Sequence, residues 1–298
     1  MGCDRYVRGL LLASQATCLI VLLGAASATF AQGDSPSVAA VPAGTQVCRS
    51  TEISKRGVGS QSRWRSKDSE WAKGNELAAT AESHTSLVDD QVVYDYVNQI
   101  ERKIVHDSQL EGCFVVKILK DAEFNAYSYP GGFIYVTSTL LLSAQNEDQL
   151  AAVLAHETAH VVARHVTTLD RESRNWRRIA LFAGPAGFSL RHYLGPIVTM
   201  KLLRNQESEA DRLGLQFFTR SGYDPDEFVR VLQIAFPDDY QPERFLDRIY
   251  NSHPPIKSRI KHLQVASHEF HFNTANHAPD NSEFALIQAQ LQISIDTK

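Results

Sequence analysis

Two histidines four residues apart, His156 and His160, lie inside a segment whose apolar residues recur with helical periodicity. Asn146 begins this segment, and Gln149 three residues later completes a capping-box pattern, so we expect a helix from 146 to about 165. Residues four apart lie on one face of a helix, one turn above each other. Both imidazoles can therefore converge on one metal ion.

A second pair of spaced side chains supplies a further ligand. Glu207 and Asp211 are also four residues apart in a helical segment. Two histidines and one glutamate form an established zinc set, and a hydrolytic zinc keeps a fourth position open. We therefore predict one Zn2+ ion on His156, His160 and Glu207, with Asp211 accepting a ring N–H of a ligand histidine. Glu157 lies about 100° further round the helix, where it can act as general base without binding the metal.

The competing interpretation of the acidic pair is an ordinary solvated helix face, on which both acids pair with Arg204 and Arg212. The H-E-x-x-H pattern alone also arises by chance. The two patterns together favour the metal site.

The rest of the chain predicts an α+β fold that is mostly helical, with a small β-sheet beside the helix of the two histidines. Short β-branched runs at 113–119 and 133–136 flank a turn signal at 129–132. Helical periodicity appears at about 87–105 and at 202–220.

The apolar stretch 179–200 is interrupted by two Gly-Pro pairs, which predicts a buried or lid-like pair of helices, with a membrane-dipping loop as the alternative. We expect a tether and irregular segment at 32–75, a zinc metallopeptidase domain at 76–267, and a C-terminal tail at 268–298 that packs on this domain. His165, five residues after His160, is expected to be a surface residue.

The N-terminus has the basic, apolar and small-residue order of a secretory signal, which we place at 1–31, with an uncleaved membrane anchor at 9–28 as the alternative. An exported chain would retain Cys48 and Cys113, which either form a disulfide or remain buried thiols. The formal net charge is -4, and the basic residues are scattered, so we expect no nucleic-acid partner.

Several separate motifs make the chain similar to the HtpX-type and CAAX-prenyl family of zinc metallopeptidases, which also includes a mitochondrial stress-activated peptidase. H-E-x-x-H is followed by E-x-x-A-D at 207–211, and the resemblance covers about 75–265. The other matching segments are Asn125-Ala126, 130–136, 221–225, Ser252-His253-Pro254-Pro255 and 258–260.

The resemblance implies a zincin-like catalytic domain in which Glu207 is the third zinc ligand and Asp211 its outer partner. It places His253 opposite the metal, either as an oxyanion donor or as a cap on the resting site. It also implies a substrate cleft bordered by a strand at 133–136, whose free edge would pair with an extended substrate. The cleft residues implied are Asn125, Gly132, Phe133, Ile134, Tyr135 and Arg259.

The implied function is an exported, periplasmic endopeptidase that cleaves unfolded or misassembled polypeptides of the cell envelope. The chain lacks the several spanning helices of the integral-membrane members, and it ends at Lys298 without a C-terminal helical-repeat domain, so it resembles a compact exported type. Peripheral membrane association stays open. The alternatives are a zinc-bound, chaperone-like protein with a closed, silent site, and a mitochondrial stress-activated relative.

Overall fold

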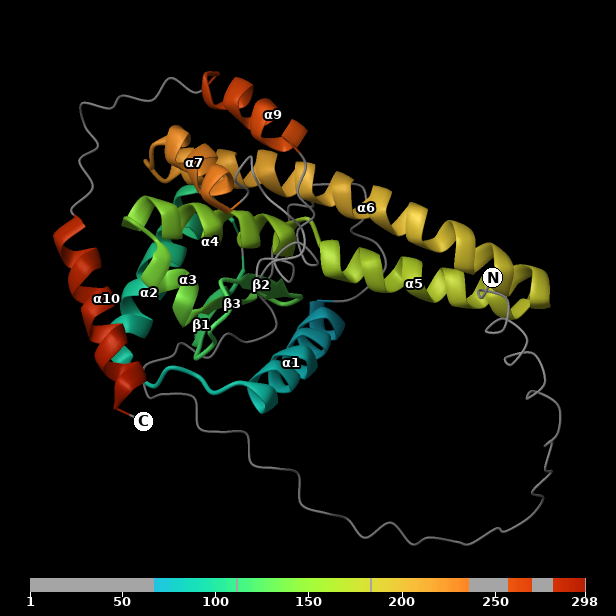
Figure 1. The fold of residues 1–298 in the computed structure, drawn as a ribbon, viewed down its shortest axis with the longest axis horizontal. Coiled ribbons are helices and arrows are strands. Elements are labelled where there is room, and N and C mark those ends of the chain that lie inside the picture. The colour runs from blue at the N-terminus through green and yellow to red at the C-terminus, as the bar shows by residue number, and fades with distance from the viewer. Residues whose placement is uncertain (1–66, 111, 183, 236–256, 270–280, 298) are drawn as a thin grey trace, which may run out of the picture. The chain divides into compact units, whose positions relative to one another are not determined.

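The computed structural model describes residues 67–110, 112–182, 184–235, 257–269 and 281–297. The predicted signal at 1–31, Cys48 and His253 lie outside these residues. The predicted fold class, α+β and mostly helical, is confirmed (Figure 1). Within the described ranges, no helix has the length and apolar character needed to cross a membrane. The elements are α1 Lys67–His84, α2 Gln91–Asp107, β1 Val115–Leu119, β2 Ala126–Tyr129, β3 Phe133–Thr137, α3 Ser138–Ser143, α4 Glu147–Val162, α5 His165–Phe182, α6 Gly184–Arg220, α7 Pro225–Ala235, α9 Lys257–Ser267 and α10 Asn281–Asp296.

The sheet has the strand order β1-β3-β2, with β3 parallel to β1 and antiparallel to β2. The predicted free edge at 133–136 is therefore wrong, because β3 is the central strand. The strand β2 was not predicted at all. The turn expected at 129–132 does join β2 to β3, and its Gly132 needs to be glycine because a Cβ there would lie 1.9 Å from the Cys113 carbonyl oxygen.

Helix α4 begins as the capping pattern predicts. The Asn146 side chain accepts a hydrogen bond from the backbone N–H of Gln149 at 2.9 Å. In the first turn, Glu147 accepts hydrogen bonds from the hydroxyls of Tyr96 at 2.5 Å and Tyr223 at 3.0 Å. A carboxylate at this end also interacts favourably with the helix dipole. These contacts fix the start of the helix that carries both predicted ligand histidines.

Helices α4 and α6 approach each other closely because small residues line their contact. A Cβ at Gly214 of α6 would lie 3.1 Å from the His156 Cα and 3.2 Å from the Ala155 carbonyl oxygen of α4. Ala155, Ala159 and Ala210 are completely buried. The absence of larger side chains here lets the backbone of α6 run beside the histidines of α4.

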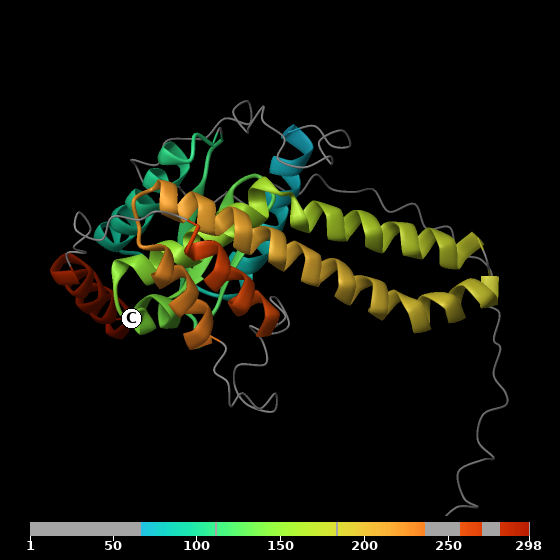
Figure 2. The same ribbon diagram turned by 90° about the horizontal axis from the view of Figure 1, so that it is seen from above.

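Helix α6 differs from the predicted helix at 202–220, because it begins at Gly184 and continues through both the Gly195-Pro196 pair and the ligand segment. Proline removes one hydrogen bond from a helix and bends it but does not always end it. Helices α5 and α6 lie side by side in both views (Figures 1 and 2). The predicted helical pair is present as α5 and α6, but its tip is not buried, because Leu181 and Phe182 are 72% and 91% exposed.

Both ends of the described chain pack on this core. Helix α1 occupies 67–84, so the segment up to residue 75 that was expected to be irregular is helical from residue 67. Ala78 of α1 packs against Tyr135 in a separate small cluster. In the C-terminal region, α10 buries Phe284, Ile287 and Leu291. The structure also makes Cys113 part of a disulfide, and all other cysteines of the chain lie outside the described residues.

Glu101 of α2 is buried behind the histidine helix, at 1% exposure. Its Oε1 accepts a 2.7 Å hydrogen bond from the Thr158 hydroxyl, and its Oε2 has no partner among the described residues. Burial raises the pKa of the Glu101 carboxyl from 4.5 to about 8. The folded protein therefore binds a proton there that the unfolded chain releases at neutral pH.

We expect Glu101 to make the protein less stable as the pH rises between 4.5 and about 8, because the folded state binds the extra proton in that window. Its contribution is at most ~1.4 kcal/mol per pH unit. Urea unfolding across this range should show a flatter pH dependence for Glu101→Gln than for the wild type. The control is Glu283→Gln, an exposed acid of α10. Equal slopes for all three proteins would contradict the prediction.

Candidate metal centre

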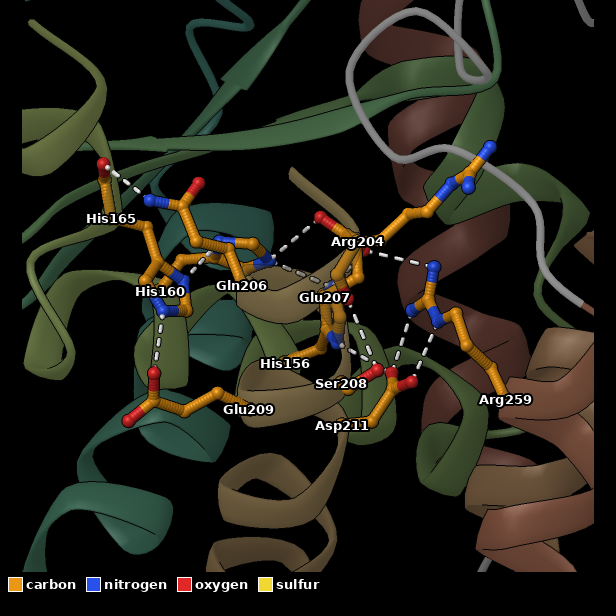
Figure 3. A network of polar contacts seen from close by, with 10 residues as sticks. All are labelled: His156, His160, His165, Arg204, Gln206, Glu207, Ser208, Glu209, Asp211 and Arg259. Atoms are coloured by element: carbon orange, nitrogen blue, oxygen red, sulfur yellow. Dashed lines mark hydrogen bonds and ion pairs between the residues drawn. The ribbon is translucent and has the colours of Figure 1, made fainter. Parts of the chain in front are cut away.

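Three side chains from two helices converge on one point. His156 and His160 come from α4 and Glu207 from α6, and their donor atoms lie within 4.8 Å of one another. The Nε2 atoms of the two histidines are 3.0 Å apart, and the Glu207 carboxylate oxygens lie 3.5 Å from His156 Nε2 and 3.4 Å from His160 Nε2 (Figure 3). The structure thus brings together the three ligands that the sequence predicts.

The spacing and chemistry of these atoms fit a metal ion. Zinc binds imidazole nitrogen and carboxylate oxygen at about 2.0–2.2 Å, so ligand atoms at tetrahedral corners lie about 3.3–3.5 Å apart. The observed separations are 3.0 to 3.5 Å. Glu207 is 1% exposed, whereas the His156 side chain is 14% exposed. The site is therefore closed on the glutamate side and accessible beside His156.

The second ring nitrogen of His156 faces Asp211. His156 Nδ1 lies 3.3 Å from Asp211 Oδ1, and Arg259 of α9 donates two 2.6 Å hydrogen bonds to the same carboxylate. Burial opposes ionisation of Asp211, but the bonds from Arg259 and His156 lower its pKa. A charged Asp211 holds the proton of His156 on Nδ1 and leaves Nε2 free for a metal.

The charge around His156 is strongly negative when no metal is bound. Burial disfavours its imidazolium, yet the hydrogen bonds and charges of Asp211 and Glu207 raise the pKa of His156 to about 10. Arg259 also places its Nη1 atom 2.9 Å from Glu207 Oε2. Arg259 is buried and pairs with both acids, Glu207 and Asp211.

His165 is the outer partner of the second ligand, which the sequence did not predict. It was expected at the surface, but it is 4% exposed and its Nδ1 lies 2.9 Å from His160 Nδ1. Its Nε2 lies 3.4 Å from Glu209 Oε2, and its carbonyl accepts a bond from Gln206 (Figure 3). Burial lowers the pKa of His165, so the ring is neutral.

A carboxylate can only accept a hydrogen bond and Glu209 faces His165 Nε2, so one proton on each of the rings His160 and His165 leaves one consistent arrangement. His165 donates from Nε2 to Glu209, so its Nδ1 must accept from Nδ1–H of His160. This arrangement leaves His160 Nε2 unprotonated and pointed at Glu207. Each ligand histidine therefore has a partner that sets its tautomer.

The other predicted site residues lie in two places. Glu157 is 2% exposed on α4, between the ligand histidines in sequence. Ile134 and Tyr135 are completely buried in the central strand. Asn125 precedes β2, and its side-chain Oδ1 is buried with no partner among the described residues. Gly132 is in the β2–β3 turn and Phe133 begins β3.

A converging set of two histidines and a glutamate, with H-E-x-x-H on a helix, defines the class of metal-dependent peptidases. Comparison with known protein families agrees with this class and identifies the family. Residues 95–267, more than half of the chain, match the model of peptidase family M48, and the chain belongs to this family. The resemblance drawn from the motifs is confirmed.

Known relatives are similar to part of this chain. The beta-barrel assembly-enhancing protease of Escherichia coli (strain K12) is 30% identical over 188 residues, which are 57% of this chain and 36% of that protein. The mitochondrial metalloendopeptidase OMA1 of Schizosaccharomyces pombe is 29% identical over 174 residues, 57% of this chain and 51% of that protein. The chain thus spans between about a third and a half of these two relatives.

We expect His165→Ala to weaken zinc binding about 10–100-fold, because His160 loses the acceptor that fixes its tautomer. His165→Asn should bind more tightly than His165→Ala, since the amide oxygen can take the place of Nδ1. Competition against a fluorescent zinc chelator measures both. The control is His106→Ala, whose side chain is 89% exposed. Zinc affinities that are the same in His165→Ala and the wild type would contradict this role.

Proposed function

We propose that this protein is a zinc-dependent endopeptidase that hydrolyses unfolded or misassembled polypeptides of the cell envelope. The observation that carries the proposal is the convergence of His156, His160 and Glu207, with an outer partner on each histidine. An accessible side beside His156 favours a catalytic site over a closed structural one.

The residues divide the chemistry between them. A bound zinc ion lowers the pKa of water and polarises the scissile carbonyl. The Glu157 carboxylate takes the proton of the attacking water and passes it to the leaving amine. Asp211 and His165 hold a ring proton on the Nδ1 atom of each ligand histidine, so that Nε2 is the atom directed at the metal. Arg259 holds Asp211 in place through its paired hydrogen bonds.

We expect Glu157→Gln to lose cleavage of unfolded casein by about 100- to 10,000-fold, because the general base is removed. Its zinc content should equal that of the wild type, whereas Glu207→Gln should lose zinc as well. Glu283→Gln, on the exposed side of α10, is the matched control and should be fully active. If wild type and Glu157→Gln degrade casein equally, the proposed function fails.

The free edge of β2 is the proposed binding place for the substrate backbone. Segment 86–88 pairs with the outer side of β1, through bonds from Val88 N to Ile118 O and from Lys120 N to Ser86 O, both 2.8 Å. Among the described strands, β2 has a partner on one side only, and it packs against α4. Of the strands described, β2 is therefore the one that can accept an extended peptide beside the histidine helix.

The register of the sheet tells which backbone groups face that edge. Thr137 N donates to Asn125 O at 3.0 Å, so this antiparallel pair is hydrogen-bonded. Such pairs alternate along antiparallel strands. Tyr127 and Tyr129 therefore bond to β3, while the backbone N–H and C=O of Ala126 and Ser128 face away from it.

We expect Ser128→Pro to lower kcat/KM on an unfolded substrate about tenfold, because it removes one N–H that bonds the substrate. Proline is tolerated in edge strands where the lost N–H faces outward. Ser128→Ala keeps the N–H and should be close to wild type. Zinc content and melting temperature must match between the two variants. Equal kcat/KM for both would show that the substrate does not pair with this strand.

His253 is the proposed residue opposite the metal, on the motif match alone. The turnover of His253→Ala, measured at a zinc content equal to that of the wild type, distinguishes an oxyanion donor from a cap on the resting site. An oxyanion donor predicts a fall in kcat, by about 100-fold or more, whereas a cap predicts a rise in basal cleavage. Unchanged turnover would remove His253 from the site.

The proposed place of action is the periplasm, on the basis of the N-terminal pattern at 1–31 and of one relative whose name refers to β-barrel assembly. The name of a second relative refers to the mitochondrion. Mass spectrometry of the mature N-terminus in the native host distinguishes a cleaved secretory signal from an anchor at 9–28.

A further inference from the structure

The α5–α6 hairpin, from residue 173 to the residue before Glu207, has a charge unlike that of the chain as a whole. Residues 173–206 contain no aspartate or glutamate. The basic residues in this stretch are Arg174, Arg177, Arg178, Arg191, Lys201 and Arg204. The complete chain carries a net charge of -4, so positive charge is concentrated in this hairpin.

The end of the hairpin is also apolar and exposed. Leu181 and Phe182, the last residues of α5, are 72% and 91% exposed. Arg177 and Arg178, one turn earlier, are exposed and form no ion pair with an acid of the described chain. Both views show this end of α5 and α6 far from α4 and the sheet (Figures 1 and 2).

We propose that this tip, residues 177–182 with the basic flanks of α5 and α6, docks on an anionic phospholipid surface. Apolar side chains that enter the boundary between headgroups and acyl chains, beside arginines that face the headgroups, are the pattern of interfacial binding. Within the described part of the hairpin, no helix is long and apolar enough to cross a bilayer. Two copies of the tip would repel each other, because neither provides acidic groups.

The tip is separate from the metal centre. Residues 184 and 207 are both on α6, and a helix rises about 1.5 Å per residue, so the two points lie about 35 Å apart along it. Substitutions at the tip should therefore leave zinc binding and peptide hydrolysis unchanged in solution. The proposal also does not depend on the proposed function, since a catalytically dead chain should bind lipid equally well.

The test uses Phe182→Trp in the full chain with Glu157→Gln, and vesicles whose brominated acyl chains quench tryptophan on contact. We expect quenching with phosphatidylethanolamine–phosphatidylglycerol vesicles, much less with phosphatidylcholine vesicles, and a decline as salt rises. The parent chain without Phe182→Trp corrects for its own tryptophans. The signal comes from the tip, so lipid binding by any other segment does not register.

Matched variants separate charge from apolar contact. In the same background, Arg177→Gln with Arg178→Gln should weaken binding about 25-fold, at about fivefold for each basic residue. Arg102→Gln with Lys261→Gln, two exposed basic residues elsewhere, should have little effect. Leu181→Gln should weaken binding, and Leu286→Gln, whose leucine is 70% exposed on α10, should not.

Three results would overturn the proposal. The first is no quenching by the anionic vesicles. The second is equal quenching by neutral vesicles, which removes the role of the arginines. The third is burial of the Phe182→Trp side chain without lipid and in proportion to protein concentration, which identifies a second copy as the occupant.

Discussion

The close contact between α4 and α6 is the interaction on which the rest of this structure depends. Gly214 allows this approach because a Cβ at that position would lie only 3.1 Å from the His156 Cα and 3.2 Å from the Ala155 carbonyl oxygen. Glu207 lies seven residues before Gly214, on the same face of α6, and can therefore reach the two histidines of α4. A larger residue at 214 would push α6 away from α4 and would move Glu207 away from the two histidines. Helix packing and metal binding therefore both require glycine at this position.

Burial of acids around this contact explains the charge of the site. Glu157, Glu207 and Asp211 are at most 3% exposed, and Arg259 is the basic partner of the last two. Buried charges are costly without compensation. In the metal-free state, a proton on His156 supplies part of the compensating positive charge. The negative charge of Asp211 and Glu207 therefore raises the pKa of this imidazole to about 10. A metal ion and this proton therefore compete for the same negative pocket.

The sequence predicted the parts of the structure that depend on local spacing. The cap at Asn146, the end of α6 before Ser221-Gly222 and the pairing of His156 with His160 follow from residues close in sequence or on one helix face, whereas Glu207 was chosen by its chemistry and its distant motif. The central position of β3 could not be predicted, because strand order depends on contacts between distant segments. Helix α1 has almost no amphipathic periodicity, so no pattern marked it.

His165 shows how a local rule fails when the backbone changes direction. Five residues after His160, it would lie off the ligand face of a continuous helix. The helix instead ends at Val162, Arg164 adopts a φ of 58°, and α5 begins at His165. This break turns the ring back toward His160. Positive φ at a non-glycine residue is a tertiary feature that residue spacing does not encode.

The length of α6 has a consequence for substrate choice if the hairpin tip rests on a bilayer. One helix then connects the lipid surface to a metal ligand, and its length sets a maximum height of about 35 Å for the metal centre above that surface. An extended chain rises about 3.4 Å per residue. A polypeptide anchored in the same bilayer would thus need about ten extended residues outside the membrane to reach a metal centre at that height, so the length of α6 would set the shortest protruding segment that can be cut.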